Sequence, residues 1–256
     1  MTELEPLIVL LLCLMSFIAG FVDSIAGGGG LILLPSLLIA GLPPQSALGT
    51  GKFAATFGTS AALANFVKNK KVIWRIAFFG LGFSFLGSVI GTKAILLFDP
   101  LTTAKIIITL LPVTAIVTFL PKKQLKTASS EFSSRELYVY IPLMCLLIGF
   151  YDGFYGPGTG TFLIFGFYIF LGMHLINASA ISKVFNLASN IGSFFTFLMA
   201  GKVLFGIGIP IAAANVVGGY LGSVVAIRQG QKLIKGFVLA VFTILLLTLI
   251  FRMWKG

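Results

Sequence analysis

Long apolar segments separated by short polar loops make up almost the whole chain. A segment of about 20 residues can cross the roughly 30 Å hydrocarbon core of a bilayer as a helix, at about 1.5 Å per residue. The pattern therefore predicts an all-α membrane protein, folded as a polytopic helical bundle. The segments of spanning length are residues 7–25, 46–67, 72–97, 101–120, 137–155, 176–200, 203–227 and 233–254.

Two glycine-rich stretches interrupt this pattern, and each precedes an apolar run that is too short to cross. The first is Asp23-Ser-Ile-Ala-Gly-Gly-Gly-Gly30, before residues 31–40. The second is Asp152-Gly-Phe-Tyr-Gly-Pro-Gly-Thr-Gly160, before residues 161–171. Each glycine disfavours a helix by roughly 1 kcal/mol relative to alanine, and irregular backbone persists at lipid depth only beside protein or a watery cavity. The two stretches therefore predict broken or re-entrant helices.

The same parts recur at a nearly constant separation. Asp152 follows Asp23 at almost the same distance along the chain as Lys183 follows Lys52, and the two lysines lie in the apolar segments after the breaks. We interpret this recurrence as one duplicated unit. The predicted organisation is an N-terminal membrane repeat at residues 1–121, a basic cytoplasmic connector at 122–136 and a C-terminal membrane repeat at 137–256.

A smaller echo supports the alignment of the two repeats. Leu86-Gly-Ser-Val-Ile90 resembles Leu221-Gly-Ser-Val-Val225. Small residues at helical spacing surround both, and they favour close packing between helices. The glycines concerned are Gly82, Gly87 and Gly91 in one repeat and Gly218, Gly219 and Gly222 in the other.

Basic residues gather in two loops and predict the orientation of the chain. Because cytoplasmic loops are enriched in Lys and Arg, we expect residues 68–75 and the connector to lie in the cytoplasm. If the first short helix returns to its own side, each repeat makes an odd number of crossings and the two repeats are inverted. A single broken span over residues 7–40 stays open as the alternative. The bases used are Lys68, Lys70, Lys71, Arg75, Lys122, Lys123, Lys126 and Arg135, while Lys202, Arg252 and Lys255 fall outside and count against this topology.

Composition agrees with a membrane protein and excludes a soluble domain. Of the 256 residues 58% are hydrophobic and 10% are charged, with a mean hydropathy of +1.07, whereas soluble domains carry about 25% charged residues. The net charge of +11 is interpreted as a topology signal, so no nucleic-acid partner is expected. Cys13 and Cys145 stand singly, and we expect no metal site and no cofactor. The amino terminus lacks the basic region of a signal peptide, so the first apolar segment is taken as mature structure.

Interrupted helices at matching places in two inverted repeats are typical of a midplane transport site. A helix that begins near Gly30 or Gly160 presents unpaired N–H groups and about half a positive charge, which favours an anion. Glycine also lets a ligand approach the backbone closely. The residues predicted to bind substrate here are Gly27, Gly28, Gly29, Gly30, Gly156, Gly158, Thr159 and Gly160.

Lys52 and Lys183 add positive charge to this prediction. An unpaired charge within a membrane helix costs about 2.5 to 3.5 kcal/mol, so each lysine needs a partner. A cation beside neutral hydrogen-bond donors suits a small oxyanion such as sulfite, a sulfonate or a carboxylate. The alternative is that each lysine snorkels or forms a structural ion pair with Asp23 or Asp152. At helical spacing Lys52 shares a face with Thr56 and Thr59, and Lys183 with Asn186, Asn190 and Ser193.

Two roles are open for Asp23 and Asp152. Aspartate at the start of such a stretch commonly caps a helix or a turn. Alternatively, each carboxylate neutralises Lys52 or Lys183 when substrate is absent and couples transport to protons. Four further polar residues are interpreted as pore-lining or packing residues: Asn65, Tyr151, Tyr155 and Asn215.

These residues resemble the TauE/SafE sulfite-exporter family of membrane permeases over nearly the whole chain. The resemblance rests on Gly20-Phe-Val-Asp-Ser-Ile-Ala-Gly-Gly-Gly-Gly-Leu31, Pro35 and Thr50-Gly-Lys-Phe53, paired with Gly149-Phe-Tyr-Asp-Gly-Phe-Tyr-Gly-Pro-Gly-Thr-Gly160. It implies a multi-pass carrier of the bacterial inner membrane that moves small organic or inorganic anions, often sulfur-containing ones. The two copies differ at Ser24 against Gly153 and at Gly28 against Pro157, which makes the two half-sites unequal.

The leading functional hypothesis is a secondary transporter of a small anion that works by alternating access. Its expected partners are the anion, the lipid bilayer and protons as the coupling ion, and a homo-oligomer is left open. The second hypothesis is a passive anion channel. An enzyme is the third, and it fits poorly because the chain contains no HExxH, GxSxG or Walker motif.

Overall fold

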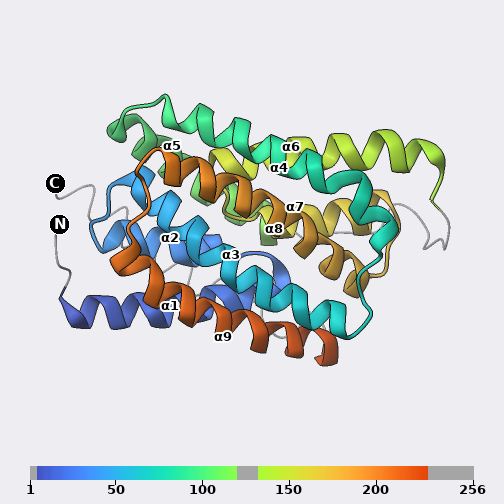
Figure 1. Ribbon diagram of the computed structural model, residues 1–256, viewed down its shortest axis with the longest axis horizontal. Helices are drawn as coiled ribbons and strands as arrows, with labels where there is room; N and C mark the ends of the chain where they lie inside the picture. The colour runs from blue at the N-terminus through green and yellow to red at the C-terminus, as the bar shows by residue number, and fades with distance from the viewer. Residues whose placement is uncertain (1–4, 120–131, 230–256) are drawn as a thin grey trace.

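The computed structural model describes residues 5–119 and 132–229, and all the regular structure in these ranges is helical (Figure 1). Every predicted segment within these ranges begins and ends within two residues of a helix or a continuous pair of helices. Most of the connector and the last predicted span, residues 233–254, lie outside the described residues. The elements are α1 (Pro6–Ala26), α2 (Gly30–Ile39), α3 (Pro44–Lys68), α4 (Trp74–Leu96), α5 (Pro100–Phe119), η1 (Glu136–Tyr140), α6 (Ile141–Phe154), α7 (Thr159–Phe165), η2 (Gly166–Phe170), α8 (Leu175–Met199) and α9 (Phe205–Gln229).

Four of the described helices are long and apolar enough to cross a membrane: α1, α4, η1 with α6, and α9. The helices α3 and α8 are not among them, although each has 25 residues. Their length agrees with the prediction of a span, but their composition is more polar. They carry the two buried lysines together with buried amides and hydroxyls. Such helices need shielding from lipid by protein.

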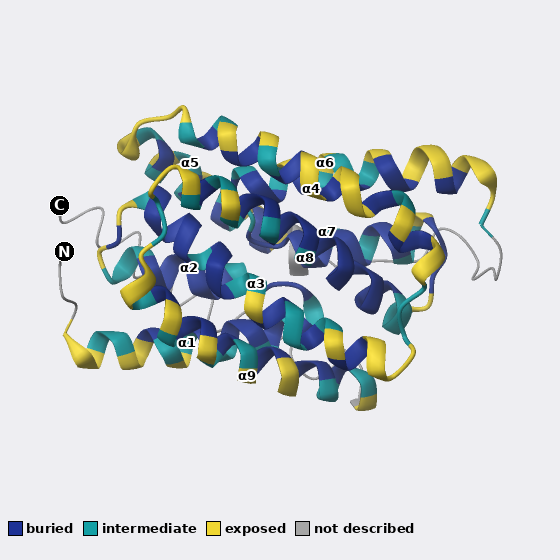
Figure 2. Ribbon diagram, viewed as in Figure 1, coloured by how far each residue is buried: buried dark blue, intermediate teal, exposed yellow. Residues whose placement is uncertain are grey.

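The outer helices supply this shielding by packing across the two halves of the chain. In Figure 1, α1 and α9 form one edge of the molecule and α4 and α6 form the opposite edge, with α3, α8 and the short helices between them. The helix α9 packs on α1 and α3, and α4 packs on α6 and α8. The fourth helix of each half therefore covers the other half. Figure 2 shows the consequence, with buried residues concentrated in the centre and exposed ones along the outer helices.

Glycines set the register of these contacts. A Cβ at Gly87 would collide with the carbonyl of Leu146, as one at Gly218 would with that of Phe17. Gly91 against Phe150 and Gly222 against Phe21 repeat the arrangement. Gly218 follows Gly87, and Gly222 follows Gly91, at the distance along the chain at which Lys183 follows Lys52. The residues that they contact are separated by the distance between Asp23 and Asp152. The echo between residues 86–90 and 221–225 is therefore displaced by one helical turn and does not pair equivalent positions.

Candidate functional site

The two glycine-rich breaks lie against each other in the centre of the molecule. The helix α1 ends at Ala26, and Gly27 follows with φ +80°. A Cβ on Gly27 would collide with the backbone of Gly160. Across this contact Thr161 donates its N–H to the Gly27 carbonyl at 3.2 Å and its hydroxyl to the Ala26 carbonyl at 2.7 Å. The breaks thus form one continuous structure in which each half completes the other.

Several backbone N–H groups in the breaks have no acceptor among the described residues. They belong to Gly28, Gly29 and Gly30 in the first break and to Gly158 and Gly160 in the second. Pro157, which stands where the first break has Gly28, has no N–H to offer. Because an unpaired buried donor costs free energy, these groups would gain from an oxygen ligand. The first break offers more of them, as the difference at Gly28 and Pro157 predicts.

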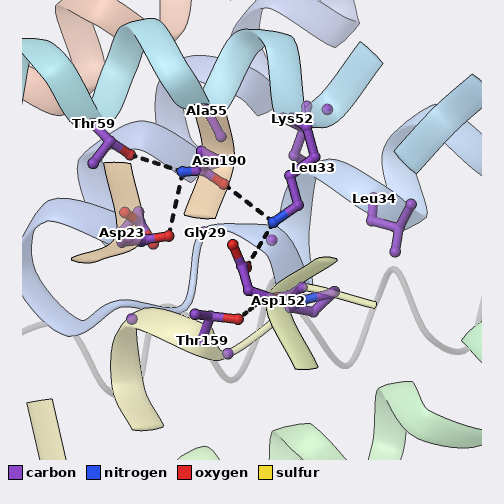
Figure 3. Close-up of a pocket in the computed structure, with 18 of the residues that line it drawn as sticks. Asp23, Gly29, Leu33, Leu34, Lys52, Ala55, Thr59, Asp152, Thr159 and Asn190 are labelled. Atoms are coloured by element: carbon purple, nitrogen blue, oxygen red, sulfur yellow. Dashed lines mark hydrogen bonds and ion pairs between the residues drawn. The ribbon is translucent and has the colours of Figure 1, made fainter. Parts of the chain in front are cut away.

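A cavity of about 80 Å³, open to water-sized molecules, lies between the breaks and the helices α3 and α8 (Figure 3). A single water needs about 10–15 Å³ by this measure, so the cavity has room for a small ion. Of the predicted site residues it is lined by Asp23, Gly27, Gly29, Gly30, Lys52, Asp152, Gly156, Gly158, Thr159, Gly160, Asn186 and Asn190. Gly28, Thr56 and Lys183 do not line it. Thr56 instead donates its hydroxyl to the Lys52 carbonyl of its own helix at 2.8 Å.

Lys52 provides the positive charge at the cavity wall. Its Nζ lies 2.6 Å from Oδ1 of Asp152 and donates to Oδ1 of Asn190 at 3.1 Å. A Cβ on Gly156 would lie 3.1 Å from the same nitrogen. The absence of a side chain there therefore leaves room beside the ammonium group. Lys52 comes from α3, whereas Asp152 and Asn190 come from α6 and α8, so this pair joins the two halves.

Amide and hydroxyl groups surround this ion pair. Asn190 donates from Nδ2 to Oδ1 of Asn186 at 3.2 Å and to the Thr59 hydroxyl at 3.4 Å. Ser189 donates its hydroxyl to Oδ2 of Asp152 at 2.5 Å. Both carboxylate oxygens of Asp152 are therefore occupied, and the residue is almost fully buried. Figure 3 shows Lys52 held between Asp152 and Asn190 at the cavity wall.

Lys183 forms the second ion pair, with Asp23, and this pair also joins the halves. The Lys183 side chain is fully buried, and its Nζ lies 2.7 Å from Oδ2 of Asp23 and also donates to the Asp23 backbone carbonyl. The Asp23 carbonyl accepts the N–H of Gly27 as well, at 2.9 Å. Lys183 therefore binds the last turn of α1 without lining the cavity, whereas Asp23 is one of the lining residues. The structural ion-pair alternative describes Lys183 well.

Neither aspartate caps a helix, so that interpretation is wrong. Asp23 lies inside α1 and Asp152 inside α6, and the residues before α2 and α7 are Gly29 and Gly158, without a side-chain cap. The physical reason is that both helices continue beyond the aspartate before the glycines end them. The carboxylates then point sideways and meet the lysines of the other half. Their role in proton coupling stays a prediction.

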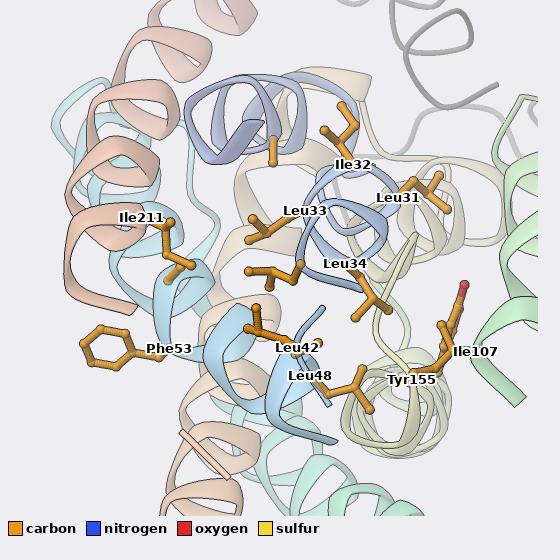
Figure 4. Packing of buried hydrophobic residues seen from close by; sticks show 14 of the residues in the cluster. Leu31, Ile32, Leu33, Leu34, Leu42, Leu48, Phe53, Ile107, Tyr155 and Ile211 are labelled. Carbon is orange, nitrogen blue, oxygen red and sulfur yellow. The ribbon is translucent and has the colours of Figure 1, made fainter. Parts of the chain in front are cut away.

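Aromatic and apolar residues support the breaks on the side of α5. Tyr151 donates its hydroxyl to the Pro157 carbonyl at 2.6 Å and contacts the Thr114 hydroxyl at 2.9 Å. Tyr155 is buried, lines the cavity, and has a hydroxyl without a partner among the described residues. Figure 4 shows Tyr155 beside the buried leucines of α2. Of the four polar residues left as pore-lining or packing, Tyr155 and Asn215 line the cavity, whereas Tyr151 and Asn65 do not.

Sequence reasoning missed two kinds of site residue. Small and apolar residues form much of the wall, among them Ala19, Gly51 and Ala55, and nothing distinguishes them in an apolar segment. Ser189 was missed because it does not share the helix face of Lys183, although a serine within a buried helix was a usable signal. The remaining wall residues are Leu33, Leu34, Ala47, Leu48 and Pro157, together with Thr59, which the sequence places on the helix face of Lys52.

Comparisons with known proteins identify a family model and several relatives that the chain resembles over most of its length. A family model described as sulfite exporter TauE/SafE matches residues 12–249. A protein of Haemophilus influenzae is 37% identical over 234 residues, covering 91% of this chain and 90% of that protein. One of Sinorhizobium is 35% identical over 251 residues, 94% of each chain, and one of Escherichia coli is 32% identical over 244 residues, 94% of this chain and 89% of that protein. All three are named probable membrane transporter proteins. No solved structure matches the chain significantly.

Proposed function

The chain belongs to the sulfite exporter TauE/SafE family, and we propose that it is a secondary active transporter of small anions in the cell inner membrane. Sulfite, sulfonates and small carboxylates are the proposed substrate class. The family description names sulfite, and the relatives are named as membrane transporters. All of these anions present compact oxygen groups to hydrogen-bond donors.

The observation that carries this proposal is the donor set around one cavity. Lys52 lies at the wall with the amide of Asn190 beside it. The free N–H groups of Gly29, Gly30 and Gly158 belong to residues of the same wall. Once the Asp152 carboxylate no longer neutralises it, the ammonium group of Lys52 stabilises an anion together with several fixed dipoles. The cavity volume of about 80 Å³ favours a small solute.

Asp152 supplies the proposed coupling to protons. In the described arrangement its carboxylate already neutralises Lys52 at 2.6 Å. An incoming anion competes with this carboxylate for the same ammonium group, because two negative charges on one cation repel each other. Protonation of Asp152 removes the negative charge that competes with the anion for Lys52, and the bound proton is then transported with the anion.

Alternating access of two inverted halves is the proposed mechanism. The cavity lies where α2 and α7, as re-entrant or broken helices, approach from the two halves, and both ion pairs cross the boundary between these halves. Rocking of one half against the other would open the cavity first to one side and then to the other. The inner-membrane location and the cytoplasmic loop at residues 68–75 complete the proposal.

Uptake into proteoliposomes tests the function directly. We expect purified protein to accumulate radiolabelled sulfite above its outside concentration when an inward proton gradient is imposed. Lys52→Ala should abolish this accumulation. Lys105→Ala is the matched control, because it removes an exposed lysine from α5, and it should transport as the wild type does.

Two outcomes would contradict the proposal. Sulfite that only equilibrates across the membrane indicates a channel, because a channel cannot move a solute against its electrochemical gradient. Wild-type accumulation by Lys52→Ala removes the site assignment. Methanesulfonate and acetate, tested as competitors in the same assay, define which oxyanions the cavity accepts.

A further inference from the structure

A second pocket lies at the far ends of α3 and α9, away from the substrate cavity. Its volume is about 220 Å³. It is lined by polar side chains and by two apolar residues of α9, Val224 and Ile227. The polar residues are Asn65, Lys68, Asn69, Tyr220 and Arg228.

Neither cation of this pocket has an acidic partner among the residues that the structure describes. No ion pair involving Lys68 or Arg228 is present in the described parts of the chain. The amides beside them are ordered, because Asn69 donates to Oδ1 of Asn65 at 3.0 Å and Asn65 donates to the Ser223 hydroxyl at 2.8 Å. Within residues 5–119 and 132–229, the result is a pocket with two positive charges that no carboxylate neutralises, beside fixed amide groups.

The pocket lies at the level expected for lipid headgroups. The chain leaves α3 at Lys68 and begins α4 at Trp74, whose side chain is 50% exposed. Tyr220 on the pocket wall is 48% exposed. Exposed Trp and Tyr are enriched at the boundary between hydrocarbon and water. Lys70, Lys71 and Arg75 follow in the same loop.

The equivalent place in the other half lacks the pair of cations and keeps a single one, Lys93, at the position of Val224. The separation that relates the two buried lysines also relates Lys68 to Met199 and Leu97 to Arg228. Met199 is 89% exposed and Leu97 is 86% exposed, so both positions are open to the surroundings but carry no charge. If cations were needed to offset the negative ends of these helices, α8 would also require one, yet it ends without a basic residue in its last turn.

From these observations we propose that the pocket between α3 and α9 binds the phosphate group of an anionic phospholipid. Lys68 and Arg228 pair with the phosphate. Asn65 donates its remaining amide N–H to the headgroup, while both amide hydrogens of Asn69 stay bonded to Asn65 and hold it in place. Val224 and Ile227 contact the glycerol and the first acyl carbons. Basic pockets between helices on the cytoplasmic side are typical sites for anionic headgroups. The site is independent of the transported substrate.

Thermal unfolding of the full-length protein in detergent tests this proposal. The probes are dioleoylphosphatidylglycerol, dioleoylphosphatidylcholine and inorganic phosphate, each added to wild type and variants. We expect phosphatidylglycerol to raise the melting temperature more than phosphatidylcholine, because a ligand that binds the folded state stabilises it. The double variant Lys68→Ala/Arg228→Ala should lose at least half of this difference.

Lys93→Ala is the matched control, since it removes an exposed cation from the last turn of α4. It should keep the difference between the two lipids in full. The proposal is overturned if the double variant keeps that difference or if Lys93→Ala loses it equally. An equal shift with inorganic phosphate alone would overturn the lipid as the source of the phosphate group. Native mass spectrometry provides a second readout, in which phosphatidylglycerol should stay bound to wild type and leave the double variant.

Discussion

The two lysine–aspartate pairs contain the same two types of residue but lie in different surroundings. Lys52 and Asp152 meet at the wall of the cavity, whereas Lys183 is sealed behind the end of α1 and reaches Asp23 from there. Both pairs join one half to the other. The difference shows that two ion pairs of the same composition can have different surroundings, and in the proposed function only the pair at the cavity binds the anion.

The neighbours differ at equivalent positions of α3 and α8. Asn190 reaches Lys52 with its side-chain oxygen, while the residue at the equivalent position of α3 is Thr59, which is too short to do the same for Lys183. Ser189 holds the second oxygen of Asp152, and its counterpart is Gly58, which has no side chain. As a result the polar groups gather on one of the two pairs.

Removing Lys183 should have the largest effect on stability. In Lys183→Ala the Asp23 carboxylate and the carbonyl at the end of α1 lose their shared donor. Breaking a buried ion pair costs about 3–5 kcal/mol, so we expect a marked fall in melting temperature. Lys52→Ala, measured beside it in the same detergent, should fall less because Ser189 still donates to the Asp152 carboxylate that this variant leaves behind. Equal losses in the two variants would remove the distinction between a supporting pair and a binding pair.

Neutralising Asp152 should strengthen binding of the anion. In Asp152→Asn the amide oxygen still accepts from Lys52, and the amide nitrogen donates to the Ser189 hydroxyl in place of the lost carboxylate oxygen. The side chain no longer competes for the charge of Lys52. We expect sulfite affinity, measured by titration calorimetry, to rise about tenfold, which corresponds to about 1.4 kcal/mol. Accumulation driven by the proton gradient should be lost in the same variant, because the proton-binding group is gone.

The control for this variant is Asp99→Asn. Asp99 accepts the N–H groups of Leu101 and Thr102 at 3.0 Å at the start of α5, and asparagine caps a helix about as well as aspartate does. Its affinity and uptake should match those of the wild type. Weaker sulfite binding in Asp152→Asn would mean that the carboxylate assists the anion instead of competing with it.

The smallest expected change in stability comes from a substitution at the end of α3, where the end of α8 provides the comparison. Both helices end with the same pair of backbone hydrogen bonds: Lys70 to Val67 and Lys71 to Phe66 in one, Gly201 to Leu198 and Lys202 to Phe197 in the other. Lys70 adopts φ +54° where Gly201 adopts φ +67°, and a side chain disfavours this conformation by about 1–2 kcal/mol.

Lys70→Gly should therefore stabilise the protein by up to about 1 kcal/mol, since the extra freedom of glycine in the unfolded chain offsets part of the gain. Thermal unfolding in detergent measures it, and Lys70→Ala, which keeps the side-chain penalty, should change little. A gain of the same size in the alanine variant would attribute the effect to the lost charge rather than to the backbone.

Much of the fold could be predicted from the sequence because it follows from local rules. Hydrophobic length predicted the helices to within two residues, and the glycines predicted the breaks before α2 and α7. The recurrence of Lys52 and Lys183 in otherwise apolar segments identified both as buried cations, and both are buried.

Contacts between distant parts of the chain could not be predicted in this way. No spacing indicates that Lys52 meets Asp152 and that Lys183 meets Asp23, since each pairing depends on how the halves assemble. The sequence therefore predicted a place in the substrate site for Lys183 and Thr56 as well as for Lys52, although neither of the first two lines the cavity. The misaligned echo at residues 86–90 has a similar cause, because the small residues that favour helix packing repeat at intervals of one turn.

The exchange of α4 and α9 between the halves has a consequence for biosynthesis. When α4 leaves the ribosome, the surfaces of α6 and α8 on which it packs have not yet been made. At that stage Gly87 and Gly91 have no contact with the carbonyls of Leu146 and Phe150, on which they pack in the folded protein. The first half therefore has no finished form of its own, and a nascent chain truncated at the connector would leave this helix without its partners.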